Sequence, residues 1–278
     1  MRIEDLDPPR ELAGAAADIL RTLERYGLHW DAQVVYQSHR AALYAEALEH
    51  LLQAGLAYPC TCSRQEVARR GRSGPFGPIY PGTCRSGHRR SPTAAAIRVL
   101  TPDRRLGLKD EIQGPYAHNL ARETGDFIIR RRDGLTSYQL AVVLDDAAQG
   151  VTQVMRGSDL LSSTPRQILL QGYLGLPTPD YGHLPVAVRP GRGKLSKQTG
   201  ASALPQDDPL PALVAALSVL GQRPPPELLE ATIDELWAWA LVHWRTRAIP
   251  RTPTVPAPPA LDRRSIRDWL SRGLPQER

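Results

Sequence analysis

The sequence lacks the features that would place it in a membrane or outside the cell. No apolar run approaches the roughly 20 residues of a transmembrane helix. Acidic residues follow Met1 where a signal peptide would have a basic start and an apolar stretch. Only 3 cysteines are present, and in a cytoplasmic chain they are not expected to form disulfides. We expect a cytoplasmic protein without membrane contact, and the sequence has no internal repeat.

The composition is that of an ordinary globular protein with a moderate positive charge. Its 278 residues, 41% of them hydrophobic, suffice for one large or two modest domains with a buried core. Lys and Arg number 35 and Asp and Glu 29, which gives a net charge of +6. This balance favours polyanionic partners such as nucleic acid or a nucleotide, without naming one.

Apolar spacing predicts alternating helices and strands up to about residue 200. Helices are expected over 11–26, over a stretch that Ser38 caps and Gly55 ends, and over 163–175. Branched residues predict strands at "DFIIRR" (126–131), "QLAVVLDD" (139–146) and "VTQVMRG" (151–157). Strands alternating with helices indicate an α/β fold with a mainly parallel, Rossmann-type sheet.

Beyond Gly200 the pattern is helical. Asp208 is expected to cap a helix that has Pro209 at its first position. A further helix is expected over about 227–244, with an inner face formed by Leu236, Trp237, Ala240 and Leu241. The proline-rich stretch 249–260 is predicted to be an extended linker that leads to a short terminal helix.

The cysteines point to a metal. Cys60, Cys62 and Cys84 lie in "YPCTCSR" (58–64) and "IYPGTCR" (79–85), and clustered thiolates in a cytoplasmic chain usually bind zinc. Chemistry alone favours His88 as the fourth ligand over Tyr80, a less usual donor. The alternative is a set of reduced structural thiols. A bound zinc would be structural, because this region has few apolar residues to fold around.

A glycine- and lysine-containing loop, "RPGRGKLSKQTGAS" (189–202), could approach a triphosphate. Lys194, Ser196 and Lys197 supply ammonium and hydroxyl groups on a flexible backbone, which suits charge that develops in nucleotidyl transfer. By composition alone, such a loop is more often a solvated basic segment.

A third group of residues suits an amino acid. Arg2, Glu4, Tyr138 and Arg156 would share a crevice if their segments lie at the carboxyl ends of adjacent parallel strands. An arginine can hold a carboxylate with two hydrogen bonds, and a carboxylate can hold an ammonium group. A surface salt-bridge network is the competing interpretation.

Taken together, these segments resemble the class I aminoacyl-tRNA synthetases of the glutamyl type. The matching segments, in order, are "RIEDLDPPR", "YPCTCSR", "YPGTCR", "RRDGLTSYQLAVVLDD", "VMRGSDLL" and "KLSKQ", and they cover nearly the whole chain. The last resembles the K-M-S-K-S loop of class I. The double proline after "RIEDLD", the "KLSKQ" form and the end at Arg278 resemble in particular the family of short paralogues, the glutamyl-Q tRNA(Asp) synthetases, which have no anticodon-binding domain.

The resemblance implies a chemistry and assigns residues to it. Glutamate would be activated by ATP, with Mg²⁺, to glutamyl-adenylate, and the acyl group would pass to the queuosine base in the anticodon of tRNA(Asp). Glu4, Tyr138 and Arg156 would bind glutamate, and Lys197, with a weaker contribution from Lys194, would bind ATP. Cys60, Cys62, Tyr80 and Cys84 would hold one zinc, which replaces the preference for His88. We expect a monomer.

The resemblance also predicts a division of the chain. Residues 1–55 and 123–200 would form the two parts of the Rossmann core, 56–122 a zinc-containing insert, and 201–278 a helical C-terminal region. The family begins with a strand and an H-I-G-H motif that this chain does not contain, so we expect Met1 to be a misassigned start. Two alternatives stay open: a non-catalytic, zinc-stabilised tRNA-binding remnant, and a glutamyl-tRNA synthetase fragment that charges the 3′ end.

Overall fold

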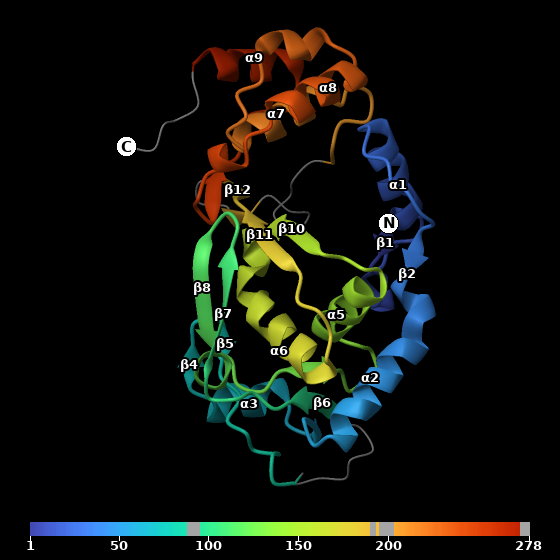
Figure 1. Cartoon of the computed structure of the whole chain (residues 1–278), viewed down its shortest axis with the longest axis vertical. Coiled ribbons are helices and arrows are strands. Elements are labelled where there is room, and N and C mark those ends of the chain that lie inside the picture. Colours follow the sequence, from blue (N-terminus) through green and yellow to red (C-terminus); the bar gives the residue numbers. More distant parts are fainter. Residues whose placement is uncertain (88–94, 190–192, 195–202, 273–278) are drawn as a thin grey trace.

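Helices and strands are mixed in most of the chain, and helices dominate its last quarter (Figure 1). The structure, a computed structural model, describes residues 1–87, 95–189, 193–194 and 203–272. The α-helices are α1 (Ala15–Arg25), α2 (Ala41–Gln53), α3 (Arg64–Arg70), α4 (Leu120–Glu123), α5 (Tyr138–Ala148), α6 (Thr164–Leu174), α7 (Leu210–Val219), α8 (Ile233–His243) and α9 (Arg263–Ser271). Short 3₁₀ helices cover Pro8–Arg10, Gln37–Arg40, Ser158–Ser163, Pro226–Glu230 and Thr246–Ala248.

The strands form both parallel pairs and antiparallel ladders. The parallel pairs are β1 (Arg2–Ile3) with β2 (Val35–Tyr36), β10 (Gln153–Gly157) with β11 (Asp180–Leu184), and β12 (Val186–Arg189) with β14 (Thr254–Pro256). The antiparallel ladders are β3 (Ala57–Cys60), β6 (Ala96–Val99) and β9 (Ile128–Arg130) in one sheet, β4 (Ser73–Gly74) with β5 (Gly77–Pro78), β7 (Arg105–Asp110) with β8 (Gly114–Asn119), and β13 (Gly193–Lys194) beside β12.

The segment expected as a strand at 139–146 is a helix, α5. Residues Leu140 to Asp146 are all buried, so no polar face marks a helical period in the sequence. Two adjacent valines then give the run the look of a strand, because periodicity cannot separate a buried helix from a buried strand. This correction places Tyr138 in the first turn of a helix rather than directly before a strand.

The expected insert shares a sheet and a core with its surroundings. β3 and β6, both within 56–122, pair with each other, and β6 pairs with β9 beyond that range. Ala57, Ile97 and Ile129 from these strands belong to the same buried cluster as Leu51 of α2 and Leu140 of α5. The division into four segments stays a prediction, but the strands of the second segment are not packed apart from the third.

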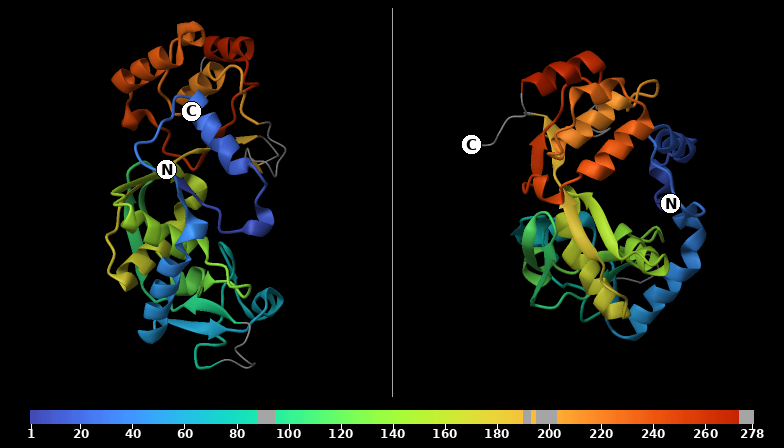
Figure 2. Two further views of the ribbon diagram at one scale, coloured as in Figure 1. Left: turned by 90° about the vertical axis from the view of Figure 1, so that its right-hand side faces the viewer. Right: turned by 45° about the horizontal axis from the view of Figure 1, so that its top comes forward.

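The C-terminal helices form a second buried cluster. α7, α8 and α9 pack around side chains such as Leu229, Leu236 and Ile266, and they lie together at one end of the molecule in both views of Figure 2. Within the described ranges, no helix combines the length and the apolar character needed to cross a membrane.

Several local expectations need correction. Ser38 lies inside a 3₁₀ helix, where its hydroxyl donates a 2.6 Å hydrogen bond to Asp5 instead of capping α2. The N-cap residue of α7 is Pro209 rather than Asp208, and Asp208 accepts from Arg263. Leu241 is 81% exposed, because it lies one turn beyond Trp237 on a side of α8 that no described segment covers. The proline-rich stretch expected to run extended bends at 251–253, and its extended part is β14, which pairs with β12.

Candidate functional site

Arg156 lies near the carboxyl end of β10, opposite His183 of β11 in the parallel register. Because ligands of open α/β folds bind beyond the carboxyl ends of the strands, this is where a substrate group is expected. The helices α5 and α6 bring their first turns to the same place, with Tyr138 on α5 and Thr164 on α6.

The guanidinium of Arg156 is held from three sides. Its Nη2 donates to Thr164 Oγ1 at 2.8 Å and to Gln167 Oε1 at 2.7 Å, both on α6. Its Nη1 lies 3.3 Å from the hydroxyl of Tyr138, and its Nε donates to His183 Nε2 at 3.1 Å. Four of the five N–H groups of an arginine are thus used. The fork is fixed in orientation, and one Nη1 hydrogen is left within the described part of the chain.

The His183 ring lies between Asp110 and Arg156 and contacts both. The His183 ring is fully buried, and its Nδ1 lies 2.5 Å from Asp110 Oδ2. Since the Nε of Arg156 can only donate, the Nε2 of His183 must accept, and its Nδ1 must carry the proton towards Asp110. Asp110 also accepts from the backbone N–H groups of Ile112, Gln113 and His183. The His183 imidazole is therefore neutral and lies between the Asp110 carboxylate and the Arg156 guanidinium.

Acidification is expected to destabilise the protein through this pair. Burial lowers the pKa of His183 and outweighs the opposing hydrogen bond to Asp110. Burial would raise the pKa of Asp110, but the hydrogen bonds from His183 and the backbone lower it overall. The unfolded chain therefore binds both protons first as pH falls, so the free energy of unfolding decreases below about pH 6.5 for the histidine. Protonation of Asp110 lowers the free energy of unfolding further, at lower pH.

Urea unfolding between pH 7 and pH 5 measures this effect. In His183→Gln, which has no titrating ring, the fall in unfolding free energy across that range is expected to be smaller than in the wild type. Equal pH slopes in the two proteins would assign the acid sensitivity to other groups.

A cavity of about 450 Å³ adjoins this arginine, lined among others by Met1, Arg2, Tyr138 and Arg156. Arg2 Nη1 lies 2.7 Å from Asp146 Oδ1, and its buried Nε has no hydrogen-bond partner within the described residues. Glu4 is half-exposed and accepts from Arg2 at 3.2 Å. Burial, and more weakly the charge of Glu4, raise the pKa of Tyr138. The structure thus brings Tyr138 and Arg156 into one cavity, with Glu4 near it.

The lysine-containing loop is described only at its start. Lys194 of β13 forms a 2.6 Å ion pair with Asp159, which follows Arg156 in the "RGSD" segment. The loop's first lysine is therefore linked to the strand end that carries the arginine site. Ser196 and Lys197 lie outside the described residues.

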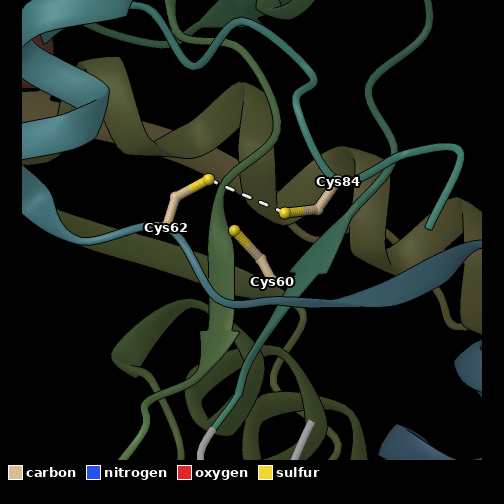
Figure 3. Close-up of side chains that lie close together, drawn as sticks. All are labelled: Cys60, Cys62 and Cys84. Carbon is tan, nitrogen blue, oxygen red and sulfur yellow. Dashed lines mark hydrogen bonds between the residues drawn. The ribbon is translucent and has the colours of Figure 1, made fainter. Parts of the chain in front are cut away.

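The three cysteines converge on one point, as Figure 3 shows. Their sulfur atoms all lie within 4.8 Å of one another, with Cys62 and Cys84 3.6 Å apart. The hydroxyl of Tyr80 lies 3.3 Å from Cys60 Sγ and 3.8 Å from Cys62 Sγ. The end of β3, the residues that follow it and the segment after β5 bring these four groups together. His88 lies outside the described residues.

This set fits a tetrahedral metal ion. Zinc–sulfur bonds of about 2.3 Å in a tetrahedron require sulfur atoms about 3.8 Å apart, close to the Cys62–Cys84 distance. Although burial opposes it, hydrogen bonds from the Thr61 backbone and from Tyr80 lower the pKa of Cys84 to about 7. A thiolate is the form that binds metal. The arrangement can hold a divalent metal, and its identity as zinc is a proposal.

Charged side chains surround the cysteine cluster. Arg98 Nε donates to Cys60 Sγ at 3.3 Å, and its guanidinium lies 3.9 Å from the centre of the Tyr80 ring. Asp126, itself fully buried, accepts from Tyr58, Thr101 and Arg85. Arg98 also donates to the Asp126 carbonyl. A cation beside a thiolate and a phenol offsets the negative charge that metal ligands would carry.

The comparison with protein families matches residues 1–231 to the family described as tRNA synthetases class I (E and Q), catalytic domain. The chain belongs to this family. Relatives named glutamyl-Q tRNA(Asp) synthetase share about half of its residues: the protein from Pseudomonas fluorescens is 50% identical over 92% of this chain and 84% of its own length. The one from Thiobacillus denitrificans is 51% identical over 93% of this chain and 86% of its own.

Solved class I structures share the fold. A glutamate tRNA ligase from Elizabethkingia meningosepticum, crystallised with its amino acid, aligns with 97% of this chain at a TM-score of 0.73 and 20% identity. A glutamate-tRNA synthetase from Elizabethkingia anophelis aligns equally well, with 21% identity. The chain spans about three fifths of the length of these two proteins. At this level of identity, the likeness concerns the fold alone.

These comparisons confirm the resemblance seen in the sequence, together with the class I α/β catalytic fold and the tRNA synthetase class of ligase. The roles given to Glu4, Tyr138, Arg156, Lys194 and Lys197 stay predictions. Sequence reasoning missed His183, Asp110 and Gln167. A histidine and a glutamine inside otherwise apolar segments, "YGHLPVAV" and "QILL", were the available signals.

Proposed function

We propose that the chain activates glutamate with ATP and transfers it to the queuosine base of tRNA(Asp). In the first step, an oxygen of the glutamate α-carboxylate attacks the α-phosphorus of ATP, and pyrophosphate leaves. In the second, the acyl carbon of glutamyl-adenylate is attacked by the base, and AMP leaves. The names of relatives about 50% identical support the substrate and the acceptor.

The observation that carries the glutamate site is the fixed guanidinium of Arg156 at the cavity beside β10. A carboxylate is the ligand that matches its remaining N–H together with the hydroxyl of Tyr138. The buried, unpartnered Nε of Arg2 would add a third donor at the same cavity. Glu4, two residues further on, would hold the ammonium group of the amino acid.

Lysine ammonium groups would meet the phosphates of ATP. In this proposal Lys197 stabilises the charge that develops on the α-phosphate, with Mg²⁺ bound to the nucleotide, and Lys194 contributes more weakly. The ion pair of Lys194 with Asp159 supports a link between the loop and the end of β10, which carries Arg156.

A structural zinc completes the proposal. Cys60, Cys62 and Cys84 would bind it, with Tyr80 as the fourth ligand because its hydroxyl lies among the sulfur atoms. The ion would fix the segments after β3 and β5 to each other and takes no part in the reaction. The cytoplasmic location and the monomeric state stay predictions.

Glutamate-dependent exchange between ATP and pyrophosphate, measured without tRNA, tests the activation step. Transfer of radiolabelled glutamate to tRNA(Asp), with and without queuosine, then tests the acceptor. Exchange, and labelling only of the modified tRNA, are expected. Labelling of both tRNAs at a periodate-sensitive 3′ end would favour charging of the 3′ end. Absence of exchange in the folded, zinc-loaded protein would favour a non-catalytic tRNA-binding protein.

His183 is expected to position Arg156 rather than to touch the substrate. His183→Leu removes the acceptor for Arg156 Nε and leaves the buried Asp110 without its side-chain donor, a loss of about 1–3 kcal/mol. We expect the KM for glutamate in the exchange reaction to rise at least about tenfold, with a smaller change in kcat. His183→Gln, which can still offer an acceptor, should recover part of the KM. A fall in kcat alone, with unchanged KM, would contradict a positioning role.

A further inference from the structure

A second and larger cavity lies among the C-terminal helices, outside the arginine site. It measures about 1210 Å³ and lies between the segment after α7, the end of α8 and the end of α9. Among the described residues, Arg223, Arg245 and Arg272 line it and no carboxylate does. The described part of its lining therefore carries three positive charges and no acid, which is the electrostatic character of a polyanion site.

These arginines follow the ends of α7, α8 and α9 and differ from the arginines within α9. Arg263 and Arg267 of α9 are paired with Asp208 and Glu230. Within the described part of the chain, no ion pair is found for the three arginines of the cavity, and all three are exposed. Their guanidinium groups remain available to phosphate oxygens, to which arginine binds well because of its planar fork.

A ring pair in the wall offers a stacking surface. Trp239 and His243, one turn apart on α8, lie parallel within 13°, with ring centroids 4.7 Å apart. His243 Nδ1 donates to the carbonyl oxygen of Trp239 at 2.8 Å, which fixes the imidazole over the indole. Bases of single-stranded or looped nucleic acid stack on such aromatic surfaces. Next to the pair, Leu241 and Val242 are 81% and 79% exposed.

The wall is built to hold its shape. The buried side chain of Gln222 accepts from the Arg245 backbone N–H at 2.7 Å and donates to the Arg245 carbonyl at 3.2 Å. Gly221 lies so close to the backbone of Ala248 that a Cβ on it would be 2.2 Å from the Ala248 carbonyl oxygen. Among the described residues, Arg223 is the non-glycine with a positive φ, of 52°. A strained backbone of this kind persists where the surrounding structure imposes it, often at binding sites.

We propose that this cavity binds a looped segment of the tRNA substrate, with a base against Trp239 and His243 and its flanking phosphates at Arg223, Arg245 and Arg272. The inference rests on the proposed function for the identity of the RNA and adds to it a contact region apart from the glutamate site. The positive lining supplies affinity that depends on salt, and the ring pair supplies a surface that accepts any base.

Arg223→Gly is the sharpest variant, because glycine relieves the positive φ while it removes the cation. Its melting temperature should equal or exceed that of the wild type, so a loss of binding cannot be ascribed to unfolding. Binding of an unmodified transcript of tRNA(Asp) is measured by fluorescence anisotropy over a salt series. We expect its Kd to rise about tenfold at low salt, and the slope of log K against log salt to fall by about 1.

The companion variants separate charge from stacking. Arg245→Ala should behave like Arg223→Gly, and Trp239→Leu should weaken binding at least about fivefold with an unchanged salt slope. Arg247→Ala, which removes an exposed arginine two residues from Arg245 that does not line the cavity, is the matched control and should bind like the wild type. If the cavity variants bind the tRNA as tightly as Arg247→Ala does, the proposal is overturned.

The two proposals fail separately. ATP–pyrophosphate exchange without tRNA does not involve this cavity, so Arg223→Gly and Arg245→Ala should retain the wild-type rate. An inactive wild type that still loses tRNA affinity in these variants would refute the proposed reaction and support the cavity. If the wild type is active and the variants bind tRNA with unaltered affinity, the proposed reaction is supported and the cavity proposal is refuted.

Discussion

Replacing Arg156 by lysine is expected to lower kcat/KM for glutamate in ATP–pyrophosphate exchange by at least about a hundredfold, equivalent to about 2.7 kcal/mol. The native guanidinium uses its planar fork to bond Thr164, Gln167, Tyr138 and His183 at the same time. A lysine ammonium keeps the charge but has three donors on a flexible stem, so it can neither reproduce these bonds nor present a fixed N–H to a carboxylate.

The experiment compares Arg156→Lys with Arg122→Lys. Arg122 is 70% exposed in its ion pair with Asp103, and such surface pairs contribute little, so this variant should stay within twofold of the wild type. Both proteins should keep their melting temperatures within a few degrees, since the lysine keeps its positive charge at the edge of the cavity. Wild-type exchange by folded Arg156→Lys would exclude Arg156 as the glutamate-binding residue.

The sequence could predict this arginine but not what holds it. "VMRGSDLL" drew attention to Arg156 because it matches a family motif, and the strand before it has a clear branched pattern. Its partners come from β11 and α6, and Asp110 from β7, 73 residues before His183. The Arg156–His183 contact depends on the register of β10 and β11, and the His183–Asp110 contact on how β7 packs beside β11. A single sequence specifies neither.

The misassigned element has a physical cause as well. α5 is buried on all sides over Leu140–Asp146, and its two carboxylates are satisfied internally: Asp145 by Gln37, Arg40 and Tyr44, and Asp146 by Arg2. A helix without a solvent-facing stripe has no amphipathic signal. The same burial explains why the polar residues at its end looked like the end of a strand.

At the cysteine cluster, the prediction from sequence was more complete. Three thiols in a segment with few apolar residues indicated a metal site, and the structure brings the sulfur atoms together. Arg98 and Asp126 were not foreseen, because Arg98 lies on β6 and Asp126 lies just before β9. Only the pairing of β3, β6 and β9 brings them beside Cys60 and Tyr58.

Cys84→Ser is expected to abolish stoichiometric zinc binding and to lower the melting temperature by about 10 °C. Loss of a ligand from a closed site removes most of the metal's contribution to folding, of which we expect about 3–5 kcal/mol to appear as stability, at about 2–4 °C per kcal/mol for a chain of this size. Zinc content by a chromogenic chelator and thermal unfolding measure the two effects. The metal-depleted wild type should melt like Cys84→Ser, and zinc should restore only the wild type.

Ser86→Ala is the matched control, because it removes a hydroxyl from an exposed side chain two residues away and should change neither quantity. Tyr80→Phe addresses the fourth ligand. It keeps the ring beneath Arg98 and removes only the oxygen near the sulfur atoms, so zinc affinity should fall at least about tenfold while packing is preserved. His88→Ala should retain the metal. Zinc lost from His88→Ala but kept by Tyr80→Phe would assign the fourth position to the histidine, and zinc binding by neither the wild type nor any variant would leave the cysteines as structural thiols held by Arg98 and Tyr80.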